Sequence, residues 1–128
     1  MIPMENDSPL QEIVGRNFEE IVRDQQKDVF IQFYAPWSGD CKKLEPIWEE
    51  LASSFNEVSN LYIARMDATS NEAEGIHISG YPTFMFFPKE NKEGIYYTGN
   101  KDLESFKIYL QENSLAIKEY NDSFKHDL

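Results

Sequence analysis

The sequence predicts an α/β fold, in which a central mixed sheet with a parallel core and an antiparallel C-terminal hairpin has helices on both faces. Over the first two-thirds of the chain, short apolar runs alternate with stretches of helical periodicity. This alternation is typical of parallel strands joined by right-handed crossovers. Two further apolar runs are separated only by a turn at residues 89–94, which indicates a hairpin. With 128 residues, the chain is long enough for one domain and too short for two.

The first elements are predicted from local patterns. Residues 11–14 form a short edge strand, and Asn17 is a good N-cap for a following helix. One apolar stripe along that helix comprises Phe18, Ile21 and Val22. Residues 29–34 are almost continuously apolar and aromatic, which predicts a strand buried on both faces.

A long helix is predicted to begin at Ser38, whose hydroxyl can cap it. Its apolar positions are Leu44, Ile47, Trp48, Leu51 and Phe55. Pro46 lies inside this pattern and should kink the helix, because proline removes a hydrogen bond and crowds the preceding turn. Residues 61–66 then read as a strand that ends at Asp67, and residues 70–76 as a short, weak helix.

The last third of the chain completes the sheet. Residues 83–87 form a strongly apolar strand, and residues 95–98 its hairpin partner. Asp102 caps a final helix, whose apolar face is Leu103, Phe106 and Leu110. The expected organisation is therefore a linker at residues 1–10, a folded domain at 11–113 and a polar C-terminal tail at 114–128.

Composition excludes several classes of function. The net charge of −11 argues against nucleic acid, whose binding needs clustered Lys and Arg. No apolar run approaches the roughly 18 residues of a membrane span, so no membrane contact is expected. The two histidines lack further ligands at metal spacing, and no glycine-rich phosphate loop is present. We therefore expect neither a metal nor a cofactor.

The chemistry centres on residues 30–44, which read as a strand, a sharp turn and the start of a helix. This arrangement places Cys41 at a helix N-terminus, where unpaired amides favour an anion such as a thiolate. A cysteine three positions earlier would complete the Cys-x-x-Cys redox motif, but that position holds Ser38. The chain contains one cysteine, so it forms no intrachain disulfide.

Three segments together resemble the thioredoxin-like domains of protein disulfide isomerases, and most closely the C-terminal domain of that type. They are FYAPWSGDCKKLEPIWEELA, ARMDATSNE and GYPTFMFFP, in the order and spacing of that family. The resemblance covers residues 11–113 and implies a thioredoxin fold. The last four residues, Lys125 to Leu128, are similar to endoplasmic-reticulum retrieval signals, although they lack the usual Glu.

The resemblance implies roles for individual residues. Ser38 stands at the position of the nucleophilic cysteine and Cys41 at that of the resolving cysteine, which is shielded under Trp37. Gln32 occupies the position of a buried Glu that accepts protons from the second cysteine, and it cannot ionise. Lys101 is the nearest match to a tuning Arg near the last helix. Asp40 replaces a His that stabilises the thiolate, and its carboxylate would repel one.

Tyr81-Pro82 resembles the cis-proline of the family, which faces the motif and leaves backbone groups free for an extended polypeptide. With Trp37 it would form an apolar rim on which an unfolded chain can pair through its backbone. The expected binding site also includes neighbouring Gly39, Asp40 and Gly80. This function does not need the missing sulfur.

These observations favour a redox-inactive or crippled relative of protein disulfide isomerase that binds unfolded or nascent polypeptides as a chaperone-like module. It would reside in the endoplasmic-reticulum lumen as a fragment without its signal peptide, with Lys125 to Leu128 binding the retrieval receptor. One alternative is an active oxidoreductase whose first cysteine was mutated to Ser38. Another is a mixed disulfide at Cys41 with a client or glutathione. The glycosylation sequon occurs twice, at Asn6-Asp7-Ser8 and Asn121-Asp122-Ser123.

Overall fold

The computed structural model describes residues 10–24, 26–71, 76–90 and 92–125 of the chain. The elements run in the order β1 (Gln11–Ile13), a 3-10 turn (Gly15–Asn17), α1 (Phe18–Val22), β2 (Asp28–Tyr34), α2 (Gly39–Ser54), β3 (Leu61–Asp67), β4 (Thr83–Phe87), β5 (Ile95–Tyr96), α3 (Leu103–Asn113) and α4 (Leu115–Lys125).

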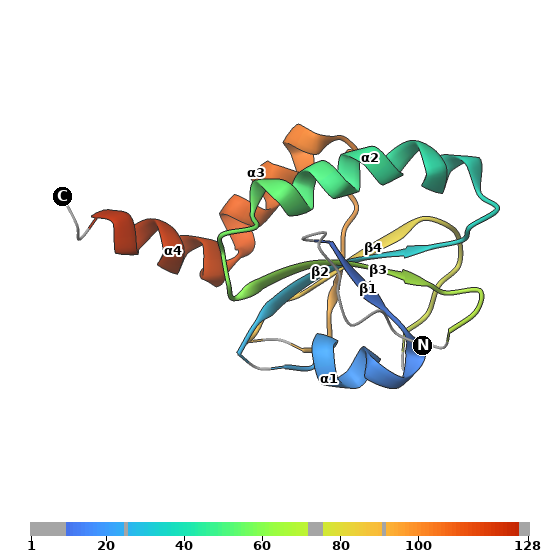
Figure 1. Cartoon of the computed structure of the whole chain (residues 1–128), viewed down its shortest axis with the longest axis horizontal. Coiled ribbons are helices and arrows are strands. Elements are labelled where there is room, and N and C mark those ends of the chain that lie inside the picture. Colours follow the sequence, from blue (N-terminus) through green and yellow to red (C-terminus); the bar gives the residue numbers. More distant parts are fainter. Residues whose placement is uncertain (1–9, 25, 72–75, 91, 126–128) are drawn as a thin grey trace.

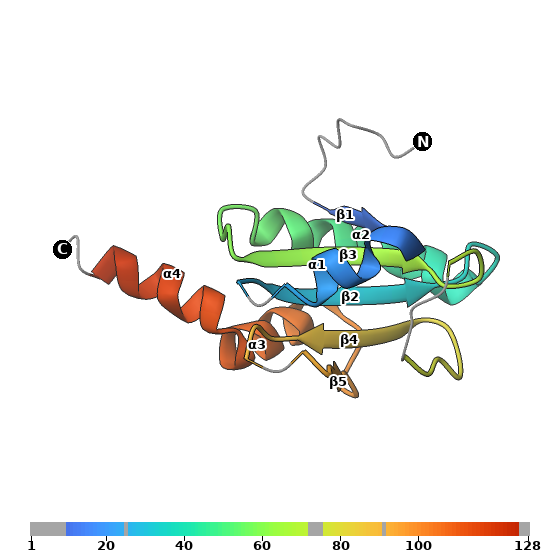
Figure 2. The same ribbon diagram turned by 90° about the horizontal axis from the view of Figure 1, so that it is seen from below.

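The strands form one mixed sheet in the order β1-β3-β2-β4-β5 (Figure 2). β1 and β2 both pair with β3 in parallel, while β4 runs antiparallel to β2 and β5 antiparallel to β4. This arrangement confirms the predicted parallel core with an antiparallel C-terminal hairpin. Because β2 lies at the centre, the end of β2 and the start of β4 are neighbours, with Phe33 opposite Thr83.

Helices cover both faces of the sheet, with α2 and α3 on one side and α1 on the other (Figure 1). Successive β2 side chains alternate between the two cores, so Phe30 packs with the α2 side and Ile31 with the α1 side. All β2 residues from Asp28 to Phe33 are buried, which explains the continuous apolar run. On the α2 side, the Trp48 ring lies 5.0 Å from the Phe30 ring, and its indole N–H donates to the Ala64 carbonyl at 2.7 Å.

The polar tail predicted after residue 113 is wrong, because residues 115–125 form helix α4. Its first turn is anchored in the domain, where Ser114, Ala116 and Ile117 are buried. The completely buried Asp28 carboxylate accepts hydrogen bonds from the Ser114 hydroxyl at 2.6 Å and the Ala116 amide at 3.0 Å. Beyond this turn, α4 projects away from the sheet (Figures 1 and 2).

Two smaller predictions also differ from the structure. Asn17 precedes α1, but its side chain accepts from the Val14 amide at 2.9 Å and makes no cap bond to the helix. Of the helix predicted over residues 70–76, positions 72–75 lie outside the described residues, and the flanking 70, 71 and 76 are not helical. In contrast, Ser38 and Asp102 cap α2 and α3 as predicted, and β4 has the predicted bounds.

Candidate functional site

The connection between β2 and α2 carries the predicted motif at the carboxyl end of the central strand. Buried Ala35 begins a tight turn in which its carbonyl accepts the Ser38 amide at 3.0 Å. The Ser38 hydroxyl in turn accepts the Cys41 amide at 3.4 Å, which satisfies one of the free donors at the start of α2. Ser38 therefore acts as the N-cap of α2.

Cys41 is the third residue of α2, and only 5% of its surface is exposed. It is a free thiol in the described structure. Exposed Asp40 occupies the same helical turn. An acidic side chain in the first turn of a helix interacts favourably with the positive end of the helix dipole.

Trp37 stands out from the surface, with 71% of its area exposed. Its ring meets the Tyr81 ring edge-to-face, with centroids 5.9 Å apart. The Tyr81-Pro82 bond is cis, as predicted. Together Trp37, Tyr81 and Pro82 form an apolar surface that we call the aromatic rim.

The antiparallel pairing of β2 with β4 explains why these residues meet, because it places the segment before β4 beside the connection that follows β2. Two hydrogen bonds hold that segment. The Thr83 hydroxyl donates to the Gly80 carbonyl at 2.6 Å, and the Tyr96 hydroxyl donates to the His77 carbonyl at 2.7 Å. Gly80, which precedes Tyr81 in the chain, is exposed, and so are Gly39 and Asp40, which follow Trp37.

Gln32 is buried in β2, with 3% of its surface exposed, on the face of the sheet that α2 covers. Its neighbour on β3 is Arg65. Because Gln32 has no carboxylate, it offers Arg65 no ion pair. The Arg65 guanidinium instead donates hydrogen bonds to Glu12 of β1 at 2.8 Å and to Glu45 of α2 at 3.2 Å. The sequence analysis did not single out Arg65, although a lone cation within a largely apolar strand could have indicated it.

Tyr34 belongs to the same group of charges. Its hydroxyl donates to Glu12 at 3.1 Å, and Arg65 lies over its ring. Burial first, and then the nearby Glu12 carboxylate, raise the pKa of Tyr34 to about 12. The tyrosine is therefore a neutral donor at physiological pH.

Lys101 lies exposed in the loop immediately before α3. Within the described residues, no hydrogen bond or ion pair joins it to Cys41 or Ser38. Its role as a counterpart of the tuning Arg stays a prediction. The described residues also contain no group of three potential metal-ligating side chains, and none of their helices is long and apolar enough to cross a membrane.

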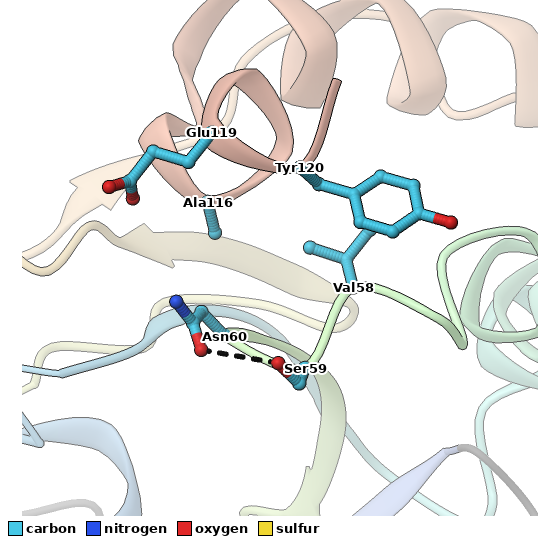
Figure 3. Close-up of a pocket in the computed structure, with 6 residues that line it drawn as sticks. All are labelled: Val58, Ser59, Asn60, Ala116, Glu119 and Tyr120. Atoms are coloured by element: carbon cyan, nitrogen blue, oxygen red, sulfur yellow. Dashed lines mark hydrogen bonds between the residues drawn. The ribbon is translucent and has the colours of Figure 1, made fainter. Parts of the chain in front are cut away.

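A pocket of about 190 Å³ lies at the opposite end of the sheet, between α4 and the loop before β3 (Figure 3). It is lined by Val58, Ser59, Asn60, Ala116, Glu119 and Tyr120. The Asn60 carbonyl of this pocket accepts a hydrogen bond from the amide of Asp28, the first residue of β2. Trp37 lies in the connection that follows the last residue of β2, at the other end of the strand. The pocket is therefore separate from the aromatic rim.

Comparison with known proteins agrees with this geometry. The family model described as thioredoxin matches residues 9–112. The chain belongs to the thioredoxin family. This match confirms the predicted thioredoxin fold. The chain is also 45% identical over 104 residues to the protein disulfide-isomerase of Gallus gallus, covering 80% of this chain and 20% of that protein. This identity confirms the resemblance to protein disulfide isomerase domains.

Other relatives of this thioredoxin-family chain give the same result. It is 42% identical over 109 residues to the protein disulfide-isomerase of Saccharomyces cerevisiae, covering 84% of this chain and 21% of that protein. The solution structure of the first thioredoxin domain of mouse protein disulfide-isomerase A4 superposes with a TM-score of 0.72 at 30% identity, covering 84% of this chain and 77% of that one. The chain thus spans about a fifth of the length of its curated relatives.

Proposed function

We propose that this thioredoxin-like domain belongs to a protein disulfide isomerase relative, is redox-inactive as it stands, and binds unfolded polypeptide as a chaperone-like module. The observation that carries the proposal is the pairing of a sulfur-free first motif position, Ser38, with an intact and exposed aromatic rim. The chain lacks one of the two sulfur atoms that thiol-disulfide exchange requires, and it keeps an apolar surface suited to binding a polypeptide.

The chemistry of exchange supports the loss of redox activity. A thiolate must attack a sulfur, and a dithiol must be oxidised or reduced in each cycle. The Ser38 oxygen can do neither, and its hydroxyl is engaged as the α2 cap. Cys41 is buried, which limits access for a client disulfide, and the neutral amide of Gln32 cannot take up its proton.

The aromatic rim supports the binding function. An exposed tryptophan held edge-to-face by a tyrosine offers a large, rigid apolar surface at low entropic cost. An extended chain lying across Pro82 would add backbone hydrogen bonds to these apolar contacts. The net charge of −11 favours the approach of basic or neutral segments over acidic ones.

The proposed location is the lumen of the endoplasmic reticulum, where unfolded clients are abundant. The protein disulfide isomerase relatives support this location, and the sequence Lys125 to Leu128 resembles a retrieval signal. Residues 126–128 lie outside the described residues, and binding of a retrieval receptor there is part of the proposal.

Peptide binding is tested by titrating the chain with a reduced, unfolded polypeptide and following tryptophan fluorescence. Trp37 is the reporter, because Trp48 is buried in the core. Trp37→Ala should weaken binding at least tenfold, or about 1.4 kcal/mol, as expected for a central aromatic contact. In Ile108→Ala, which truncates an exposed apolar residue of α3, affinity should stay unchanged. The affinities of the unaltered chain and of both variants are compared by calorimetry, because Trp37→Ala lacks the fluorescence reporter. Equal affinity of these three proteins would disprove a role for the rim.

Redox activity is tested by comparing insulin reduction by the chain with that by Ser38→Cys and by Ser38→Cys combined with Gln32→Glu and Asp40→His. We expect no turnover by the chain, weak turnover by the single variant and more by the triple variant. Turnover by the unaltered chain would refute redox inactivity. Full activity of Ser38→Cys alone would favour the alternative, an active oxidoreductase whose first cysteine was replaced. The intact scaffold around Ser38 makes that alternative testable.

A further inference from the structure

We propose that Asn121 is a site of N-linked glycosylation. It opens the tripeptide Asn121-Asp122-Ser123, which matches the acceptor sequence and has no proline in the middle. The inference rests on the proposed lumenal location, because the glycosylating machinery works only in that compartment. It adds a modification to the proposed peptide-binding domain.

The structure places the acceptor where a large group can be attached. Asn121 is exposed on α4. This helix projects from the body of the domain (Figure 1). The preceding residue, Tyr120, still packs against the core, and its hydroxyl donates to Glu57 at 2.7 Å. Asn121 thus directly follows Tyr120, the last residue of α4 that is described as packing against the core.

The described contacts of α4 with the core end at Tyr120. The acceptor tripeptide occupies the last turns of α4, which ends at Lys125. Helix ends fray, since their last carbonyls lack intrahelical partners. The described buried core of α4 stops at Ile117, so an opening after Tyr120 leaves it intact.

The transfer itself is a substitution at a sugar carbon. The donor is an oligosaccharide joined through a pyrophosphate to a lipid, and the membrane-bound transferase supplies it. The Asn121 amide nitrogen forms a bond to the anomeric carbon, and the bond from that carbon to the pyrophosphate oxygen breaks. The pyrophosphate leaves with the bonding electrons, and the amide gives up one proton. No oxidant or reductant is involved.

A glycan at Asn121 would not obstruct the aromatic rim. α4 is tied to the first residue of β2 through Asp28, whereas Trp37 follows the last residue of that strand. A strand of seven residues spans roughly 20 Å. α4 and the connection from β2 to α2 also lie at opposite ends of the molecule in both views (Figures 1 and 2).

The test expresses the full 128-residue chain in cultured animal cells behind a supplied signal peptide and scores only the protease-protected, lumenal protein. All proteins carry Ser8→Ala, which removes the other sequon. The comparison is between this background, Asn121→Gln, Ser123→Ala and the matched control Ser123→Thr, which keeps an acceptor hydroxyl. Removal of N-glycans by an amidase is read by electrophoresis and by peptide mass, because it converts a glycosylated Asn to Asp.

The background and Ser123→Thr should each carry one amidase-sensitive glycan mapped to Asn121, and the other two variants none. An amidase-insensitive background, or a glycan retained in Asn121→Gln, would overturn the proposal. Because the signal peptide is supplied, the result does not depend on peptide binding by the rim. A chain that is glycosylated here, while the natural protein is found outside the lumen, would contradict the proposed location and not the acceptor.

Discussion

Replacing Asp28 with alanine should destabilise the domain more than any other single carboxylate removal. The Asp28 side chain is completely buried and accepts three hydrogen bonds, from the Lys89 amide at 2.7 Å, the Ser114 hydroxyl and the Ala116 amide. The last two donors are buried at the start of α4, so alanine would leave them without an acceptor. Each buried unsatisfied donor costs about 1–3 kcal/mol, which gives a loss of about 2–6 kcal/mol.

The measurement is urea denaturation followed by far-ultraviolet circular dichroism, combined with amide hydrogen exchange. Asp28→Ala should lower the urea midpoint and speed exchange in α4 more than in β2, because the contact that anchors α4 is lost. Asp28→Asn keeps one acceptor oxygen and should lose less. Exposed Glu112→Gln is the control and should stay within about 0.5 kcal/mol of the parent. If Asp28→Ala also stays within that range, the anchoring role of the carboxylate is refuted.

Three further predictions concern the core and the sheet. The pKa of Tyr34 is raised in the folded chain from its ordinary value of 10.0 to about 12, so the stabilisation by its neutral form is complete below about pH 10 and is lost as the pH rises toward 12. Tyr34→Phe should therefore flatten the decline in the free energy of unfolding over this pH range, as measured by urea titration at several pH values. Gly94→Ala should cost about 1–3 kcal/mol in thermal denaturation, because φ is +91° and a methyl group would strike the Phe87 ring, and a neutral result would contradict that geometry. Trp48→Phe should cost about 1–3 kcal/mol by the same measurement, because it leaves a buried β3 carbonyl without its indole donor, and a stability equal to the parent would argue against that bond.

Local patterns in the sequence predicted much of the sheet. The apolar run at residues 29–34 marked a doubly buried strand, since β2 faces a core on each side. Ser38 and Asp102 marked the starts of α2 and α3 through their capping chemistry. These signals are local, so the sequence carries them without knowledge of the fold.

Helix α4 was missed because its anchor is not local. Ile117, Tyr120 and Phe124 recur at helical spacing, but a helix of 11 residues is marginal in water without tertiary packing. The contact that fixes the helix joins Ser114 to Asp28, which is 86 residues earlier in the chain. A charged residue at the start of an apolar strand gives no indication of the segment that will cap it.

The candidate site shows the same division. The contact between Trp37 and Tyr81 followed from the family resemblance and from the pairing of β2 with β4. The pairing of Arg65 with Glu12 and Glu45 did not, because it depends on the parallel register of β1 and β3 and on the position of α2. Register is set by tertiary packing, and the sequence pattern alone left it open.

The two ends of β2 carry separate tasks, and this separation makes the proposals independent. At its first residue, Asp28 anchors α4, and just beyond its last residue lies the exposed ring of Trp37. Substitutions separated by more than about 7–10 Å and without shared partners combine additively. The double variant Asp28→Ala with Trp37→Ala should therefore lose as much stability as Asp28→Ala alone and as much peptide affinity as Trp37→Ala alone. Affinity is compared under conditions where the double variant and the single variants are all folded. A coupling above about 0.5 kcal/mol in either property would mean that β2 transmits strain from its anchored end to the aromatic rim.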